Sequence, residues 1–203
     1  MRHHGSGVLV LLLLSAALLG AAPPPPRIVA EWNSPEAPGK EAGKVLVIAI
    51  TDDREVRHRF EDKLVTHLRG RKVSAVTSYP LVPDLMAPGS REEVLRRIAE
   101  ERIEAAISFR VVPLEGREEA AWDADWRREA GEGGTLRDLL AATLPLKKVK
   151  SKQYGVEVTL WGPVTTSRSW SGRSGPHRLE DLRKGAAGFI QDVILTLIDA
   201  RRI

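Results

Sequence analysis

The sequence predicts an α/β fold: a β-α-β-α-β unit, then a β-hairpin and a C-terminal helix, around a mixed sheet of roughly five strands. Three observations support this prediction. Residues 45–50 (VLVIAI) form an unbroken aliphatic run, typical of a strand that is covered on both faces. Segments with helical apolar spacing alternate with strand-like segments over residues 54–112. Residues 179–198 carry a continuous helical stripe of apolar side chains.

The first half of this unit is indicated by two strand-like runs and the helix between them. After residues 45–50, Val56, Phe60, Leu64 and Leu68 recur every four residues, which predicts a helix over about 54–69. Asp52 and Glu55 have the spacing of a capping pair at the start of this helix. Residues 73–79 (VSAVTSY) alternate in the manner of a second strand.

The second half repeats the pattern. Ser90 and Glu93 have the spacing of a capping box, and a helix with an apolar face follows them. Residues 105–112 (AAISFRVV) predict a third strand. Strand, helix and strand at this spacing imply parallel pairing through right-handed crossovers.

Residues 113–152 interrupt this regularity as a polar insertion. They contain Trp122 and Trp126 at helical spacing and a leucine-rich stretch over 136–144, so we expect part of the insertion to be helical and docked, or else functionally mobile. Residues 155–161 and 166–170 then predict the two strands of a hairpin. Glycine and serine over 171–175 predict a loop before the last helix.

The N-terminal residues 1–22 have the pattern of an export signal. Arg2 precedes an uncharged apolar run over 8–19, and small residues follow at positions 20–22. The run is shorter than the roughly 20 residues of a membrane-spanning helix. We therefore expect an extracytoplasmic protein, in a bacterial periplasm, whose leader is either cleaved after Ala22 or retained as an anchor. The Pro-rich residues 23–43 predict a tether, and residues 44–203 predict one domain.

Composition excludes several classes of function. The chain has 203 residues and no cysteine, which excludes thiol catalysis, zinc–cysteine sites and iron–sulfur ligation. The net charge of +4 is too small, without clustering on one face, to indicate nucleic-acid binding.

The first candidate for chemistry is the acidic pair Asp52 and Asp53, since ligands bind beyond the carboxyl ends of strands in open parallel sheets. A phosphoryl-receiver interpretation also needs an aspartate after the third strand, and residues 109–113 contain none. Helix capping is the simpler role for the pair. His58 and His67 lie nine residues apart on one helix, and His177 is distant, so none has metal-ligand spacing.

Two glycine-rich segments also lack a catalytic pattern. Ser171 and Ser174 follow a predicted strand without the Gly-x-Ser-x-Gly elbow or a following helix. Residues 131–134 (GEGG) lack the Gly-Lys-Ser/Thr of a phosphate loop. The sequence therefore predicts no catalytic, cofactor-binding or metal-ligating residue.

Two surface features leave alternatives open. Lys147, Lys148, Lys150 and Lys152 either make a weak contact with an anionic surface or form a solvated edge before the next strand. Trp122 and Trp126 either anchor a partner or cover the domain's own core.

The mature domain resembles a family of small bacterial envelope lipoproteins. The pieces that carry this resemblance are Val45–Ile50, Phe60-Glu61, Ser78-Tyr79-Pro80, Val158–Trp161, Trp170-Ser171-Gly172, Pro176 and Leu179–Ile198. The arrangement is also similar to the N-terminal domain of the Tol–Pal periplasmic propeller protein and to curli-type secretion lipoproteins. The resemblance covers residues 44–200, apart from the insertion, and implies a non-enzymatic envelope interaction or assembly role with a protein partner. Ala21 stands where such lipoproteins carry the lipidated cysteine.

Two functional hypotheses follow. In the first, the chain is an exported, envelope-associated interaction module without enzymatic activity. In the alternative, it is a small-ligand-binding protein or hydrolytic enzyme that uses the carboxyl edge of the sheet near Asp52, Asp53 and Tyr79. A concave pocket with converging polar groups at this edge favours the alternative, and a flat edge rejects it.

Overall fold

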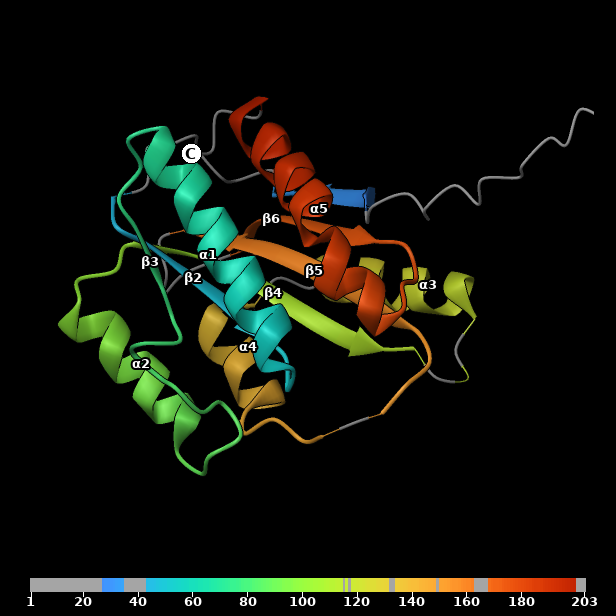
Figure 1. Cartoon of the computed structure of the whole chain (residues 1–203), viewed down its shortest axis with the longest axis horizontal. Coiled ribbons are helices and arrows are strands. Elements are labelled where there is room, and N and C mark those ends of the chain that lie inside the picture. The colour runs from blue at the N-terminus through green and yellow to red at the C-terminus, as the bar shows by residue number, and fades with distance from the viewer. Residues whose placement is uncertain are drawn as a thin grey trace, which may run out of the picture.

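The computed structural model describes residues 27–34, 43–114, 116, 118–131, 134–148, 150–162 and 168–199. It contains a six-stranded mixed sheet with helices on both faces (Figure 1), so the predicted α/β class is confirmed. The strands are β1 (Ile28–Asn33), β2 (Val45–Ile50), β3 (Ala75–Thr77), β4 (Ala105–Pro113), β5 (Tyr154–Trp161) and β6 (Arg168–Ser174). The helices are α1 (Arg54–Gly70), α2 (Ser90–Glu100), α3 (Glu119–Gly131), α4 (Leu136–Thr143) and α5 (Leu179–Asp199).

The strand order is β1-β6-β5-β4-β2-β3. As predicted, β2 pairs in parallel with β3 and β4, and β5 with β6 forms an antiparallel hairpin. β5 also pairs antiparallel with β4, which joins the two units into one sheet. The export signal predicted over residues 1–22 lies outside the described residues.

The sheet has six strands where the sequence predicted five. The additional strand, β1, lies inside the segment that the sequence analysis assigned to a tether, and it pairs antiparallel with β6. Its residues Ala30 and Trp32 pack against α3, which supplies the burial that a tether would lack. Because β1 continues the ladder, β6 extends through Ser174, and the loop predicted over residues 171–175 is strand as far as Ser174.

Two predicted helix caps are also wrong in detail. Asp53, and not Asp52, is the N-cap of α1, and its side chain accepts a hydrogen bond from the Val56 amide at 2.9 Å. Gly89, with a φ of 80°, occupies the N-cap of α2, while the Ser90 hydroxyl donates to the Leu85 carbonyl instead. In both cases the helix begins one residue away from the expected position.

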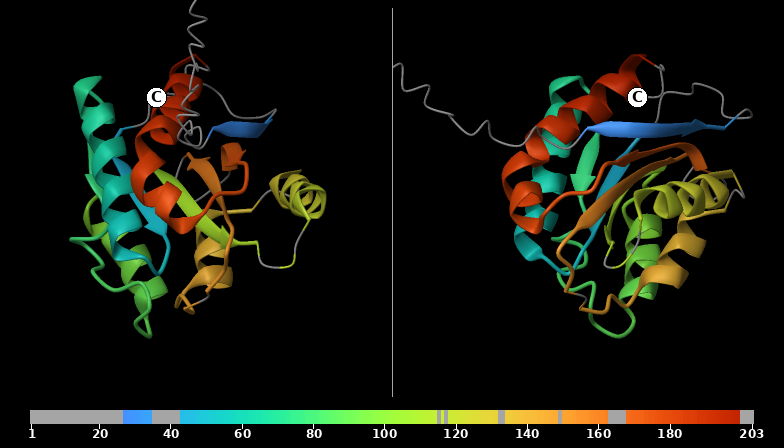
Figure 2. Two further views of the ribbon diagram at one scale, coloured as in Figure 1. Left: turned by 45° about the vertical axis from the view of Figure 1, so that its right-hand side comes forward. Right: turned by 90° about the vertical axis from the view of Figure 1, so that its right-hand side faces the viewer.

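Two apolar cores lie on opposite faces of the sheet. Helices cover both of these faces (Figure 2). α1 and α5 cover one face, where Phe60, Phe109 and Phe189 pack against one another. α2 and α4 cover part of the other face. α3 covers the rest of that second face, over the antiparallel strands, and contributes to a small separate cluster with β1. The insertion over residues 113–152 thus supplies two docked helices.

A buried ion pair fixes the carboxyl end of β2. The Glu61 carboxylate is fully buried, and it accepts hydrogen bonds from the amides of Ala49 at 3.0 Å and Ser78 at 2.6 Å. Arg57 donates to Glu61 at 3.1 Å and to the Val82 carbonyl at 2.7 Å. These bonds tie α1 to β2 and to the segment after β3, so residues 50–52 emerge from the sheet in a defined position.

Candidate functional site

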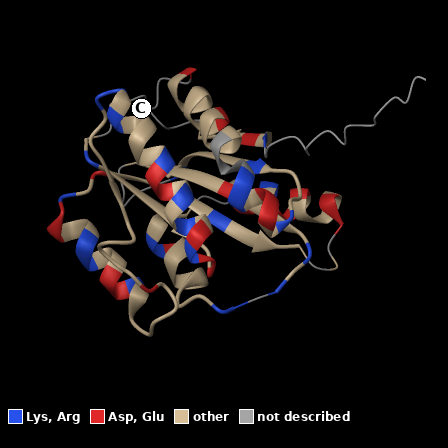
Figure 3. Ribbon diagram, viewed as in Figure 1, with Lys and Arg blue, Asp and Glu red and all other residues tan. Residues whose placement is uncertain are grey.

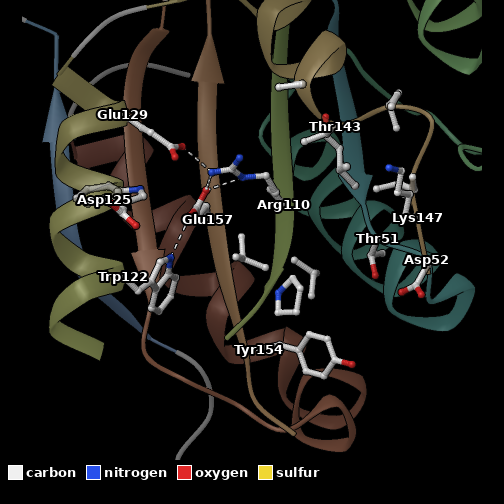
Figure 4. A pocket seen from close by; sticks show the side chains of 18 of the residues that line it. Thr51, Asp52, Arg110, Trp122, Asp125, Glu129, Thr143, Lys147, Tyr154 and Glu157 are labelled. Atoms are coloured by element: carbon white, nitrogen blue, oxygen red, sulfur yellow. Dashed lines mark hydrogen bonds and ion pairs between the residues drawn. The ribbon is translucent and has the colours of Figure 1, made fainter. Parts of the chain in front are cut away.

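A pocket of about 580 Å³ opens at the carboxyl ends of the parallel strands β2 and β4 (Figure 4). The sheet edge forms its floor, α3 forms one wall, and residues 142–147, at the end of α4 and beyond it, form the facing wall. This is the place where open α/β sheets bind ligands, and the volume lies in the usual range of small-molecule sites.

The floor carries a charged pair on otherwise apolar strands. Arg110 of β4 and Glu157 of β5 are direct register partners, although they are 47 positions apart in the sequence. Arg110 Nε donates to Glu157 Oε2 at 2.7 Å. The side chains are only 24% and 9% exposed, so each charge depends on the other for compensation.

Two side chains of α3 bond to the Arg110–Glu157 ion pair. Arg110 Nη2 donates to Glu129 Oε2 at 2.8 Å, and Trp122 Nε1 donates to Glu157 Oε1 at 3.1 Å. Figure 4 shows Glu129, Glu157 and Trp122 converging on one side of Arg110. Both oxygens of Glu157 are therefore engaged, which fixes its side chain in one orientation.

Gly155 makes this arrangement possible. It lies on β5 beneath the Trp122 indole, and a Cβ added there would be 2.1 Å from the nearest Trp122 carbon. Trp122 is 1% exposed as a result of this close approach. The absence of a side chain at position 155 is therefore a steric requirement of the pocket wall.

A second set of charges holds α3 at the neighbouring strand. Arg173 of β6 donates to Asp123 Oδ1 at 2.6 Å, and its guanidinium lies 4.6 Å from the Trp122 ring centroid. Hydrogen bonds from Arg127 and Arg173 hold the pKa of Asp123 below its usual range. Burial opposes the protonation of Arg110, but the carboxylates of Glu157 and Glu129 outweigh it and raise the pKa of Arg110.

The facing wall presents Thr51 and Asp52 from the end of β2, with Thr143 and Lys147 opposite α3 (Figure 4). Its backbone is fixed because the Leu146 amide donates to the Leu85 carbonyl at 3.1 Å. The buried Leu144 side chain anchors the same segment in the second core. Apart from Thr51 and Asp52, the described residues of both walls therefore come from the insertion that the sequence analysis identified.

A smaller cavity of about 30 Å³ lies behind the Arg110–Glu129 pair. Ser108, Thr159, Ser171 and Arg168 are among the residues that line it, and it has room for about one water molecule. Within the described part of the chain, Arg168 Nε is buried without a hydrogen-bond partner. Burial, together with the nearby Arg110 charge, lowers the pKa of Arg168.

Of the three residues in the edge hypothesis, the structure brings only Asp52 to the pocket. Asp53 instead caps α1 and pairs with Arg183 of α5 at 3.1 Å. Tyr79 does not line the pocket: its hydroxyl donates to Asp62 at 2.7 Å, and its ring stacks on His58. The sequence correctly located the edge but not the side chains that form the site.

The other residues that the sequence analysis singled out lie either in the protein interior or on its surface. Trp122 and Trp126 are buried against the sheet, so they cover the protein's own interior. Ser171 and Ser174 are buried in β6, where Ser174 Oγ accepts from the Val156 amide at 3.0 Å. The lysines at 147, 148, 150 and 152 are exposed on the segment between α4 and β5 (Figure 3), and Lys147 borders the pocket.

The described residues contain neither a candidate metal site nor a helix that could cross a membrane. In these ranges, no group of three or more His, Asp or Glu side chains could hold a metal ion. No helix in the same ranges has the length and apolar character to cross a bilayer.

Sequence reasoning missed Arg110, Glu157 and Glu129. The available signal was a charged residue at an inward position of each of two apolar strands, Arg110 in residues 105–112 and Glu157 in residues 155–161. Charges at such positions need partners. Their pairing depends on strand register, which the sequence does not fix.

His177 gives the stability of the protein a predicted pH dependence. Its amide and carbonyl both bond to Tyr154 at 2.7 Å, and its Nε2 is buried without a hydrogen-bond partner among the described residues. Burial lowers the pKa of His177, and the Asp181 charge only partly opposes this. The unfolded chain therefore binds a proton at His177 more readily than the folded chain, so stability is lost as the pH falls below the ordinary histidine pKa of about 6.5.

We expect the free energy of unfolding, measured in urea between pH 7.5 and 5.5, to decrease more steeply with falling pH in the wild type than in His177→Gln. Equal slopes in the wild type and His177→Gln would contradict this assignment.

Comparisons with known proteins do not identify a family for this chain. No protein-family model matches the chain, and no curated protein sequence matches it. Two solved structures of the PelC dodecamer from Paraburkholderia phytofirmans, one of them a variant, are similar to it with TM-scores of 0.40. Their sequence identities are 13% and 12%, over 81% of this chain and 93% of theirs. These values are too low to place the chain in a family or to assign it a function.

Proposed function

We propose that this chain is an exported, envelope-associated protein that binds a small polar ligand in the pocket at the carboxyl edge of its sheet. The observation that supports ligand binding is the pocket itself, in which Arg110, Glu157 and Glu129 converge beneath α3. This is the concave, polar edge that distinguishes the second functional hypothesis from the first.

The arrangement of charges supports the binding of a polar ligand. Arg110 bonds to two carboxylates, and Glu157 accepts from both Arg110 and Trp122. Groups held in this way are oriented before a ligand arrives, which reduces the entropic cost of binding.

Export and envelope association rest on the sequence pattern of residues 1–22 and on the family resemblance. Fractionation of the producing cell, with mass measurement of the mature chain, tests both the location and the fate of the leader. A full-length chain in the cytoplasmic fraction would contradict export. Contact with an envelope protein partner, or of the lysines at 147–152 with an anionic surface, stays a prediction.

The ligand-binding proposal is tested by thermal-shift screening against a defined pool of small polar metabolites. Thr143→Trp places an indole in the pocket from the facing wall, whereas Ala141→Trp adds the same side chain at an exposed position that does not line the pocket. We expect at least one compound to raise the melting temperature of the wild type and Ala141→Trp. At a ligand concentration of 100 times Kd, the stabilisation is about 2.7 kcal/mol.

The same compound should leave the melting temperature of Thr143→Trp unchanged. Stabilisation of all three proteins would place the ligand elsewhere. A pool that stabilises none of them would reject the proposed function.

A further inference from the structure

α3 is the wall of the pocket whose buried side chains belong to neither of the two main cores. Trp126 and Ala130 form a small cluster with Ala30 and the partly buried Trp32 of β1, separate from the two cores that hold the other helices. Trp122 is the third buried residue of the helix. Elements that pack outside the main cores of a fold, with few neighbouring elements, open at lower free energy than those cores.

Charged contacts supply the rest of the attachment. Asp123 accepts from Arg173 at 2.6 Å, Glu129 accepts from Arg110 at 2.8 Å, and Arg168 donates to the Glu129 carbonyl at 2.6 Å. We call these five residues the latch. Its three arginines come from β4 and β6 and meet one helix, so the latch joins α3 to two strands of the sheet.

When α3 separates from the sheet, the three latch arginines each retain a contact with another group of the sheet. Arg110 retains Glu157, which is on the neighbouring strand. Arg168 retains the Trp161 ring, 5.4 Å from its guanidinium, and Arg173 retains the Ser174 carbonyl at 3.2 Å. Opening therefore leaves none of these three guanidiniums without a contact, which limits the cost of separation.

The ends of α3 are bordered by residues that permit rotation of the chain. Gly116 precedes the helix with a φ of 70°, and Gly134 follows it with a φ of 114°. Glycine adopts such angles more readily than other residues, and a Cβ at Gly116 would meet no atom within 4 Å. Hinges are commonly built from such positions.

We propose that α3 is a lid, held closed by the latch, whose opening widens the entrance to the pocket. The inference rests on the proposed function for its purpose, but the opening itself is measurable without a ligand. Because the described wall opposite α3 is anchored in the second core, α3 is the side from which the pocket opens.

Thiol labelling tests the opening directly, since the chain has no cysteine of its own. Ala130→Cys places a thiol on the buried face of α3, and Ala106→Cys places one in the interior of β4; both alanines are fully buried. With Ellman's reagent as the probe, we expect Ala130→Cys to react at least tenfold faster than Ala106→Cys in the native state. Equal rates would mean that α3 separates only on global unfolding, and would overturn the proposal.

The latch is tested in the same Ala130→Cys background. Asp123→Asn weakens the bond to Arg173 and should raise the labelling rate about tenfold, without changing the rate of Ala106→Cys. Glu119→Gln removes the same charge from an exposed position on the same helix and should change neither rate. If Glu119→Gln and Asp123→Asn act alike, net charge rather than the latch sets the rate, and the latch is wrong.

Amide hydrogen exchange provides a second measurement if a cysteine variant fails to fold. In the unmodified chain, residues 119–131 should exchange faster than β4 and β5, and added salt should increase the difference. Uniform exchange across α3 and the strands would again overturn the lid. Either failure leaves the ligand screen unaffected, so the lid and the proposed function fail separately.

Discussion

Replacement of Gly155 by valine is expected to lower the free energy of unfolding by about 3 kcal/mol, the upper part of the range for overpacked interiors. The clash would be with Trp122, whose ring lies 2.1 Å from the position of a Cβ at residue 155. The backbone at Gly155 cannot shift easily, because it lies on a central strand, so the Trp122 indole would have to break its bond to Glu157. The indole would leave its site, and α3 would lose its largest buried side chain.

Equilibrium unfolding in urea measures this effect, and ligand affinity in the same variant measures its effect on the pocket. Gly131→Ala is the matched control, because a Cβ at that helical glycine meets no atom within 4 Å. The control should be neutral or more stable by up to about 1 kcal/mol. A Gly155→Val protein as stable as the wild type would show that Trp122 is not tightly packed on β5.

Replacement of Arg110 by methionine is expected to destabilise the protein by about 3 kcal/mol, since it leaves a buried carboxylate without its cation. Glu157 is 9% exposed and would retain only the Trp122 indole as a donor among the contacts described above. The double variant with Glu157→Gln should recover part of the loss, because an amide is less costly to bury than an unpaired charge.

Arg97→Met provides the comparison at the surface. Arg97 also pairs with a carboxylate, that of Glu93 at 2.9 Å, but both side chains are about one-third exposed. Its loss should cost less than about 1 kcal/mol. Equal losses from Arg97→Met and Arg110→Met would contradict the view that burial makes the Arg110–Glu157 pair important.

The accuracy of the sequence predictions follows from the range over which each signal acts. β2, α1 and the hairpin were predictable because apolar periodicity is local and each element buries a continuous face. β1 was missed because its strand-forming residues lie next to a Pro-rich stretch, and its burial comes from α3, some 90 positions later in the chain. Such a partner leaves no local trace in the sequence.

The candidate site shows the same difference between features with a local sequence signal and features that depend on distant contacts. Asp52 was identified because it directly follows a strand whose carboxyl end was evident from the sequence. The Arg110–Glu157–Glu129 group joins two strands and an insertion helix, and it forms only once register and docking are set. Tyr79 was associated with the site on the assumption that strand ends meet, but its ring stacks on α1, against His58.

The insertion over residues 113–152 links these observations to function. It provides α3 for one wall and residues 142–147 for the facing wall, and Glu129 and Trp122 of α3 bond to the Arg110–Glu157 pair of the floor. A polar insertion of this kind would be difficult to explain as a mere connection between β4 and β5. Its docking explains why the sheet tolerates charged residues on its second face.

The central claim, that this edge of the sheet binds a small polar ligand, is tested most directly by a crystal structure of the protein with a compound from the screen. The account predicts ligand density in the pocket between Arg110 and Thr143, with α3 closed over it. Density at another surface, with this pocket filled only by solvent at saturating ligand, would contradict the claim.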